Sequence, residues 1–339
     1  MNIFIGNTKK SAINYSFQYF RVFFLFLVIC THLKWFSPNN LFALFFDKGN
    51  ISVTFFFVLA GYFHNNFIKK QKYKKYRMYI YDIFHKKKDY FIRFYIYFIV
   101  VGFYAFIISR YNILQVIQYG CIDLMFLPVI IPHCDNFMIF SSWYFMTYVL
   151  CMVFSVQSYN LLHLKQKKAI LNICILILLH LSISFFSYKF VPNIAGWIMY
   201  NSIYSRLIDF TIGMILKDLH DETVGGLTFP SIQEILAIVI VITISIVKIP
   251  IMWSYSIILC AISYLIYVFS FENGKISSIF KKNIIITNIC KHSFSIYLFH
   301  FIIMMYSFLS PWSPSIYLNL VVSILFIVIV ENLLMNFKI

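Results

Sequence analysis

Long runs of apolar residues recur along the chain and are separated by short polar connections. Ten of these runs have about 17 to 23 residues, the length that crosses a bilayer as an α-helix. They cover residues 15–36, 51–68, 89–108, 141–160, 168–187, 197–216, 231–249, 251–271, 288–308 and 314–334. The pattern predicts an all-α fold, namely a polytopic integral-membrane bundle of about ten transmembrane helices in a single domain over residues 1–339.

The composition agrees with a membrane protein. Of the 339 residues, 61% are hydrophobic and 12% are charged, whereas a soluble domain carries about 25% charged residues. We interpret the first apolar run as a retained helix, because only Lys9 and Lys10 precede it and further spans follow. The seven cysteines show no metal-ligand spacing, so no metal site is expected.

The placement of lysine and arginine predicts the orientation of the bundle. Alternate connections, beginning with the first, hold only five basic residues: Lys34, Lys48, Arg110, Lys189 and Lys248. The other connections and the two ends of the chain hold twenty. Because cytoplasmic loops carry the excess of lysine and arginine, both termini are predicted to be cytoplasmic. The net charge of +16 is then explained by topology, and no nucleic-acid partner is expected.

The first apolar run contains Arg21 and His32, eleven positions apart. Eleven residues make almost three helical turns, so both side chains lie on one face, roughly 16 Å apart along the axis. Ionisable residues are costly in hydrocarbon, and two on one face indicate a polar path through the bundle. Arginine suits phosphate, and histidine exchanges a proton near neutral pH. Taken singly, each residue also fits an interfacial position, with Arg21 reaching toward the headgroups.

Two further segments have more than one interpretation. The connection 69–88 interleaves nine basic residues with tyrosines, which suits contact with anionic lipid headgroups or with a phosphorylated cytosolic donor. In the second run, Ala60 and Gly61 are small enough to let a neighbouring helix approach closely.

Five segments, in order, carry a resemblance to a known family. They are the Arg21-x10-His32 helix; the segment from Phe56 to Gly61, Phe-Phe-Val-Leu-Ala-Gly; Ser142-Trp-Tyr-Phe145; Arg206-Leu-Ile-Asp-Phe-Thr-Ile-Gly213; and Ser293-Phe-Ser-Ile-Tyr-Leu-Phe-His300. Together they resemble the membrane-bound acyltransferase-3 family, whose members acylate sugars and other acceptors. Arg93 stands at the second arginine of that family's Arg-x-x-Arg motif, whereas Tyr90 occupies the first position here.

The resemblance implies an enzyme that transfers an acyl group other than an amino-acyl group. It implies acetyl-CoA, or another acyl-CoA, as the co-substrate, and a hydroxyl of a cell-surface or lipid-linked glycan as the acceptor. His32 would act as general base, and Arg21 and Arg93 would bind the acyl donor. The expected location is a bacterial inner membrane, which the chain crosses several times in contact with lipids.

Four more residues are second-tier candidates, in the site or structural: Trp143, Tyr144, Arg206 and His300. Arg206 is equally suited to a local ion pair with Asp209, three positions later on the same helix. His300 lies within an apolar run, where an orienting hydrogen bond is an alternative to direct chemistry. Trp143 and Tyr144 fit an aromatic belt at the outer interface or the lining of an acceptor site.

Two other classes of protein share this apolar pattern. A transporter or flippase for lipid-linked sugars also needs a polar path, but such carriers often contain internal repeats, and none is evident here. An O-antigen polymerase would be expected to have a large, charged outer loop. The longest outer connection, 109–140, holds only Arg110, Asp123 and Asp135 as charged residues.

Overall fold

The computed structural model describes residues 14–36, 48–71, 75–107, 112–134, 139–162, 168–223, 225–309, 324–325 and 328. Over these residues the protein forms helices and no strands, which confirms the predicted all-α class. In the described part, four helical segments are long and apolar enough to cross a membrane: Tyr15–Lys34, Gly49–Lys69, Ala169–Phe190 and Ile251–Phe269. The full set of ten spans and the cytoplasmic position of the termini stay predictions.

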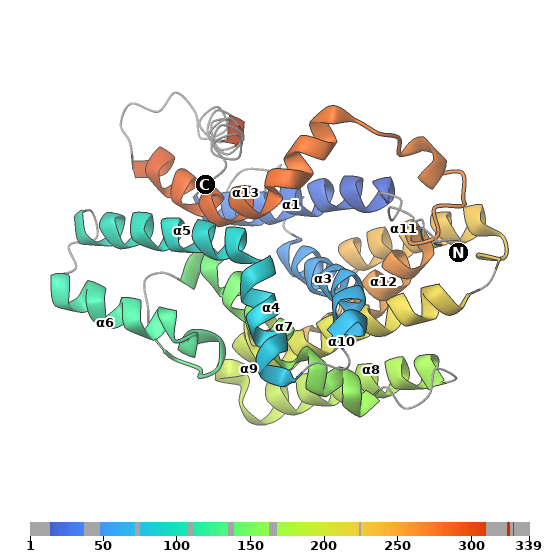
Figure 1. Ribbon diagram of the computed structural model, residues 1–339, viewed down its shortest axis with the longest axis horizontal. Helices are drawn as coiled ribbons and strands as arrows, with labels where there is room; N and C mark the ends of the chain where they lie inside the picture. The colour runs from blue at the N-terminus through green and yellow to red at the C-terminus, as the bar shows by residue number, and fades with distance from the viewer. Residues whose placement is uncertain are drawn as a thin grey trace, which may run out of the picture.

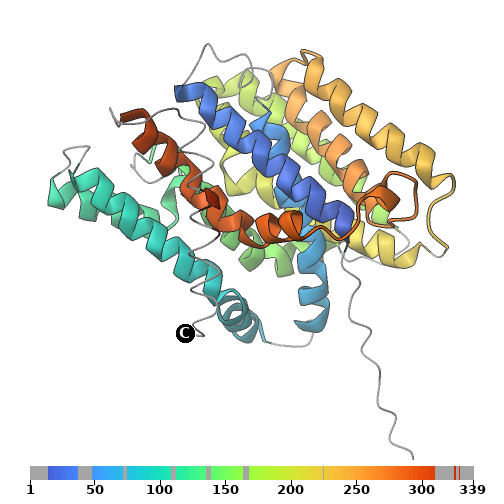
Figure 2. The same cartoon turned by 90° about the horizontal axis from the view of Figure 1, so that it is seen from above.

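The described helices are α1 (Tyr15–Phe36), α3 (Gly49–Gln71), α4 (Tyr76–Lys86), α5 (Lys88–Ile107), α6 (Ile113–Leu124), α7 (Ile139–Leu162), α8 (Ala169–Phe190), α9 (Pro192–Tyr200), α10 (Ile203–Glu222), α11 (Pro230–Ile246), α12 (Ile251–Phe269) and α13 (Ile284–Leu309), with the 3-10 helices η1 (Leu127–Val129) and η3 (Ser277–Ile279). Figures 1 and 2 place α5 and α6 at one end of the bundle and α11 and α12 at the other. Helix α3 lies between these ends and packs against α1, α10 and α12.

Most predicted spans coincide with a helix to within a few residues. This holds for α1, α3, α5, α7, α8, α11, α12 and α13. The predicted span 314–334 falls almost entirely outside the described residues.

The predicted span 197–216 is not one helix. Helix α9 ends at Tyr200, and the chain leaves helical geometry at Ser202, which has extended backbone angles and directly precedes α10. Serine at this point competes for backbone carbonyls and favours a helix start. Ser202 Oγ and Ser205 Oγ both donate to the carbonyl of Ile198, and so satisfy the last turn of α9. The local side-chain chemistry therefore ends one helix and begins the next inside an apolar run.

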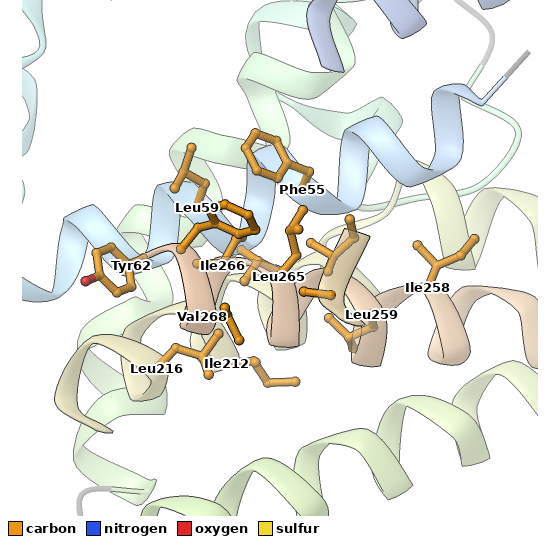
Figure 3. Close-up of a cluster of buried hydrophobic side chains, with 14 of the residues drawn as sticks. Phe55, Leu59, Tyr62, Ile212, Leu216, Ile258, Leu259, Leu265, Ile266 and Val268 are labelled. Atoms are coloured by element: carbon orange, nitrogen blue, oxygen red, sulfur yellow. The ribbon is translucent and has the colours of Figure 1, made fainter. Parts of the chain in front are cut away.

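The contact between α3 and α10 is made by facing glycines. A Cβ on Gly61 would lie 1.9 Å from the carbonyl oxygen of Phe210, and a Cβ on Gly213 would lie 1.9 Å from that of Val58. The predicted close approach at Gly61 is therefore confirmed, with α10 as the neighbour. Beside this crossing, apolar side chains of α3, α10 and α12 form a buried cluster that includes Phe55, Leu59, Ile212, Leu259 and Ile266 (Figure 3).

The described part of the connection 109–140 packs onto the bundle. Helix α6 lies against α5, and η1 lies against α7. Trp197 Nε1, on α9, donates to the carbonyl of Pro128 over 2.9 Å. Asp123, in the last turn of α6, has no solvent-exposed surface, and burial raises the pKa of its carboxyl to about 8.

Candidate functional site

One cavity of about 360 Å³ combines cations with aromatic and apolar walls. Four helices, α1, α3, α7 and α13, and the α4–α5 junction each contribute one face to it. The face of α3 is a stripe at helical spacing. The lining residues are Arg21, Leu25, Phe56, Leu59, Ala60, Phe63, His64, Phe67, Ile83, Lys86, Lys87, Tyr90, Tyr144, Tyr148, Met152, Ser293, Phe294 and Tyr297. Such a mixture suits a ligand with an anionic end and a less polar end.

The predicted pair on α1 does lie on one side of that helix, and the side faces α13. Arg21 Nη2 donates to Ser293 Oγ over 3.0 Å, and Arg21 lines the cavity. The His32 ring packs beside the rings of His300 and Phe301, with centroids 5.1 Å and 5.4 Å away. His32 is buried and does not border the cavity. Both residues therefore lie at the contact between α1 and α13, but Arg21 borders the cavity whereas His32 is buried among aromatic rings.

A chain of ring contacts links the cavity to His32. Tyr297 lines the cavity, and its ring centroid is 5.6 Å from that of His300. His300 Nδ1 donates to the carbonyl of Tyr297 over 2.5 Å, so its Nε2 carries the lone pair of the neutral ring. His300 therefore makes a hydrogen bond inside the bundle, as predicted, and its ring also contacts that of His32. Its orienting role stays a prediction.

Lys86 and Lys87 contribute positive charge to the cavity wall. The sequence does not single them out from the nine basic residues of the connection 69–88. Helix α4 ends at Lys86 and α5 begins at Lys88, so both lysines stand at the junction of two helices. Lys86 is exposed, which marks an opening of the cavity to solvent, and Lys87 is half-buried. Their Nζ atoms lie over the rings of Phe67 and Tyr90, at 4.6 Å and 5.2 Å from the centroids. In the sequence, these two lysines could be recognised only as members of the basic, tyrosine-containing connection 69–88.

Arg93 and Trp143 lie next to the cavity without lining it. The guanidinium of Arg93 is 5.9 Å from the ring centroid of Tyr90, whose side chain does form part of the wall. Trp143 is buried between Tyr144 and Tyr200, so it does not face lipid headgroups as a belt residue would. Tyr144 lines the cavity and contacts the ring of Tyr297, with the centroids 4.9 Å apart.

Arg206 belongs to a separate buried network. Its Nη1 donates to Asp209 over 2.6 Å and to Thr54 over 3.1 Å, and its Nε donates to the carbonyl of Tyr200 over 2.9 Å. His180 Nε2 lies 3.8 Å from the other carboxylate oxygen of Asp209. The predicted ion pair is present, and it ties α10 to α3, α8 and the end of α9. Within the described residues, no group of three histidine, cysteine or acidic side chains could hold a metal ion.

The helices and the cavity define a membrane protein with a cationic, aromatic-walled binding site inside an α-helical bundle. The family described as "Acyltransferase domain" matches residues 14–330, and the chain therefore belongs to the acyltransferase-3 family. That match covers nearly the whole chain and makes the protein a membrane acyltransferase. No match was found among curated proteins or among solved structures.

Proposed function

We propose that the protein transfers an acyl group, most simply acetyl from acetyl-CoA, to a hydroxyl of a cell-surface or lipid-linked glycan in a bacterial inner membrane. The observation that carries this proposal is the cavity, where Arg21, Lys86 and Lys87 stand at one site with apolar and aromatic walls. Coenzyme A carries phosphates at one end and a thin thioester arm at the other. The cations bind the phosphates, and the apolar and aromatic walls of the cavity accommodate the thioester arm.

The donor phosphates bind near the exposed Lys86, and the thioester arm extends inward along α1. His32 takes the proton from the acceptor hydroxyl while that oxygen attacks the thioester carbonyl. The carbon–sulfur bond then breaks, and the thiolate takes up the proton from the His32 imidazolium. His300 positions the His32 ring, and Tyr297 separates His32 from the arm before transfer; both roles are supported by the ring contacts of these residues.

Binding and transfer are tested separately. Purified protein is titrated with acetyl-CoA, first unchanged and then as Arg21→Ala and as Lys86→Ala/Lys87→Ala. Each loss of a phosphate-binding cation is expected to weaken binding by about tenfold. Lys275→Ala is the matched control, because this exposed lysine stands outside the cavity. Equal affinities for all four proteins would contradict the proposed donor site.

The acceptor and His32 are tested in cells by mass spectrometry of surface glycans, with and without the gene. A loss of one acyl mass is expected on deletion and again in His32→Ala, while His32→Ala still accumulates in the membrane. Unchanged acylation in His32→Ala would contradict its role as base. Altered glycan chain length would instead favour a polymerase, and loss of exported glycan would favour a transporter.

A further inference from the structure

His64 is a histidine of the cavity wall that the catalytic proposal does not use. It lies on the lining stripe of α3 and is only 6% exposed. The rings of Phe67 and Phe210 lie on its flanks, with centroids 5.3 Å and 5.4 Å away. Its Nε2 is 2.8 Å from the hydroxyl oxygen of Tyr79. The ring is therefore held in one orientation at the edge of the cavity.

The hydrogen bonds around Tyr79 fix which nitrogen of His64 carries the proton. The Tyr79 hydroxyl donates its single proton to the carbonyl of Met152 over 2.7 Å, and Ser155 Oγ donates to the same carbonyl over 2.6 Å. The two hydroxyl oxygens lie 2.9 Å apart. Two of these three close oxygen pairs then hold a proton. If Tyr79 donated to His64 instead, only the Ser155 proton would remain for the three pairs, and two pairs would lack one. Nε2 of the neutral His64 ring is therefore the donor, and Nδ1 carries the lone pair.

The position of Tyr79 also shows where this lone pair points. Tyr79 is buried and does not line the cavity, so the Nε2 edge of His64 is turned away from the cavity. Because His64 itself lines the cavity, we assign its opposite edge, which carries Nδ1, to the cavity side. The charged side chains of the wall, Arg21, Lys86 and Lys87, can only donate hydrogen bonds. The neutral His64 ring thus adds a strong, fixed acceptor to a wall whose charged groups are all donors.

We propose, resting on the acyl-CoA donor assigned above, that His64 Nδ1 accepts a hydrogen bond from an amide N–H of the pantetheine arm. Coenzyme A brings two such amides into the cavity behind its phosphates. An N–H that is buried without an acceptor costs binding free energy. Cations can hold the phosphates but cannot satisfy an amide N–H. His64 is therefore a positioning residue that sets how deep the thioester reaches, and it distinguishes pantetheine thioesters from other phosphorylated ligands.

Two variants separate the two nitrogens of the ring. In His64→Asn the side-chain oxygen stands near the original Nδ1, so the acceptor is kept. In His64→Gln the amide nitrogen stands near the original Nε2, so the donor to Tyr79 is kept and the acceptor is lost. The two ligands are acetyl-CoA and adenosine 3′,5′-bisphosphate, which has phosphates but no pantetheine arm. Dissociation constants are measured for both ligands with the unchanged protein and with each variant.

His64→Gln is expected to bind acetyl-CoA about tenfold more weakly, because one buried N–H loses its acceptor. Its affinity for adenosine 3′,5′-bisphosphate is expected to stay within about twofold of the unchanged protein. His64→Asn is expected to keep both affinities. Tyr79→Phe, which leaves the tautomer of His64 undetermined, is expected to weaken acetyl-CoA binding only partly and to leave the bisphosphate unaffected.

Other outcomes overturn one proposal or both. If His64→Gln weakens both ligands equally, or neither, the role of His64 is refuted while the donor site stands. If the unchanged protein binds neither ligand, the acyl-CoA donor itself is refuted. The melting temperature of each variant, measured without ligand, shows whether that variant is misfolded. If His64→Gln is misfolded, the acetyl-CoA affinities of His64→Asn and Tyr79→Phe are compared instead. Equal acetyl-CoA affinity in those two proteins would again refute the role of His64.

Discussion

Gly61→Ala should separate α3 from α10 and destabilise the whole bundle. The added Cβ would lie 1.9 Å from the Phe210 carbonyl oxygen, whereas ordinary contact begins near 3.4 Å. The two helices must therefore move apart by about 1.5 Å. The obstacle is backbone, which cannot rotate away as a side chain can. Overpacking costs typically 1–3 kcal/mol, and we expect about 3 kcal/mol here.

The measurement is the apparent melting temperature of purified protein in detergent, compared at one scan rate because unfolding of such proteins is often irreversible. A loss of about 3 kcal/mol in a chain of this size lowers the melting temperature by about 5 °C. Gly196→Ala is the matched control: it makes the same change within α9, where the new Cβ meets nothing within 4 Å. This control should gain about 0.5–1 kcal/mol, because alanine favours a helix over glycine.

Gly213→Ala provides an internal check from the other helix, since its Cβ would lie 1.9 Å from the Val58 carbonyl oxygen. It should destabilise as Gly61→Ala does. The double variant should lose less than the sum of both, because the first separation already makes room for the second Cβ. The reasoning is refuted if Gly61→Ala melts at the temperature of Gly196→Ala, or if the two losses add fully.

Three further substitutions test buried polar groups, each by thermal unfolding. Arg206→Ala leaves Asp209 as an unpaired buried charge and should cost about 3–5 kcal/mol, more than the double change Arg206→Met/Asp209→Leu; the reverse order would contradict this. Glu234 accepts three backbone N–H bonds from the turn 274–277, and Glu234→Gln should cost about 1.5–3 kcal/mol; an unchanged melting temperature would refute it. Burial raises the pKa of Asp123 from 3.8 to about 8, so the folded state holds a proton that the unfolded chain has lost. Stability should fall as pH rises between these values, and Asp123→Asn should remove that slope; a slope that persists would contradict the assignment.

Much of the fold could be predicted because it depends on composition and on spacing within one helix. Apolar length located eight of the described helices, and the eleven-residue spacing of Arg21 and His32 placed both on one side of α1. The structure shows that this side faces α13. The three-residue spacing of Arg206 and Asp209 gave their ion pair. The break at Ser202 was missed because apolar content continues through it. There, hydroxyl groups that bind the carbonyls of α9 outweigh hydropathy in setting the helix boundary.

His64 was missed for a different reason, since its role depends on partners far away in the sequence. A histidine three positions after Gly61 has no local pattern that separates a packed ring from a ligand-binding one. Its tautomer is set by Tyr79, and the proton of Tyr79 is set by the carbonyl of Met152 on α7. Three helices must be assembled before the acceptor atom is defined. A sequence pattern limited to one helix cannot contain that information.

The choice of cations at the cavity also depends on assembly, in this case on a single junction. Lys87 leaves helical geometry between α4 and α5, with φ of −108° and ψ of 14°. The direction of the chain changes there, so Lys86, Lys87 and Tyr90 border the cavity while Arg93 lies over the ring of Tyr90. If α4 continued into α5 as a single helix, these side chains would point in other directions. The motif position of Arg93 lies in this same region of the chain, and the turn at Lys87 determines which cations of the region reach the cavity.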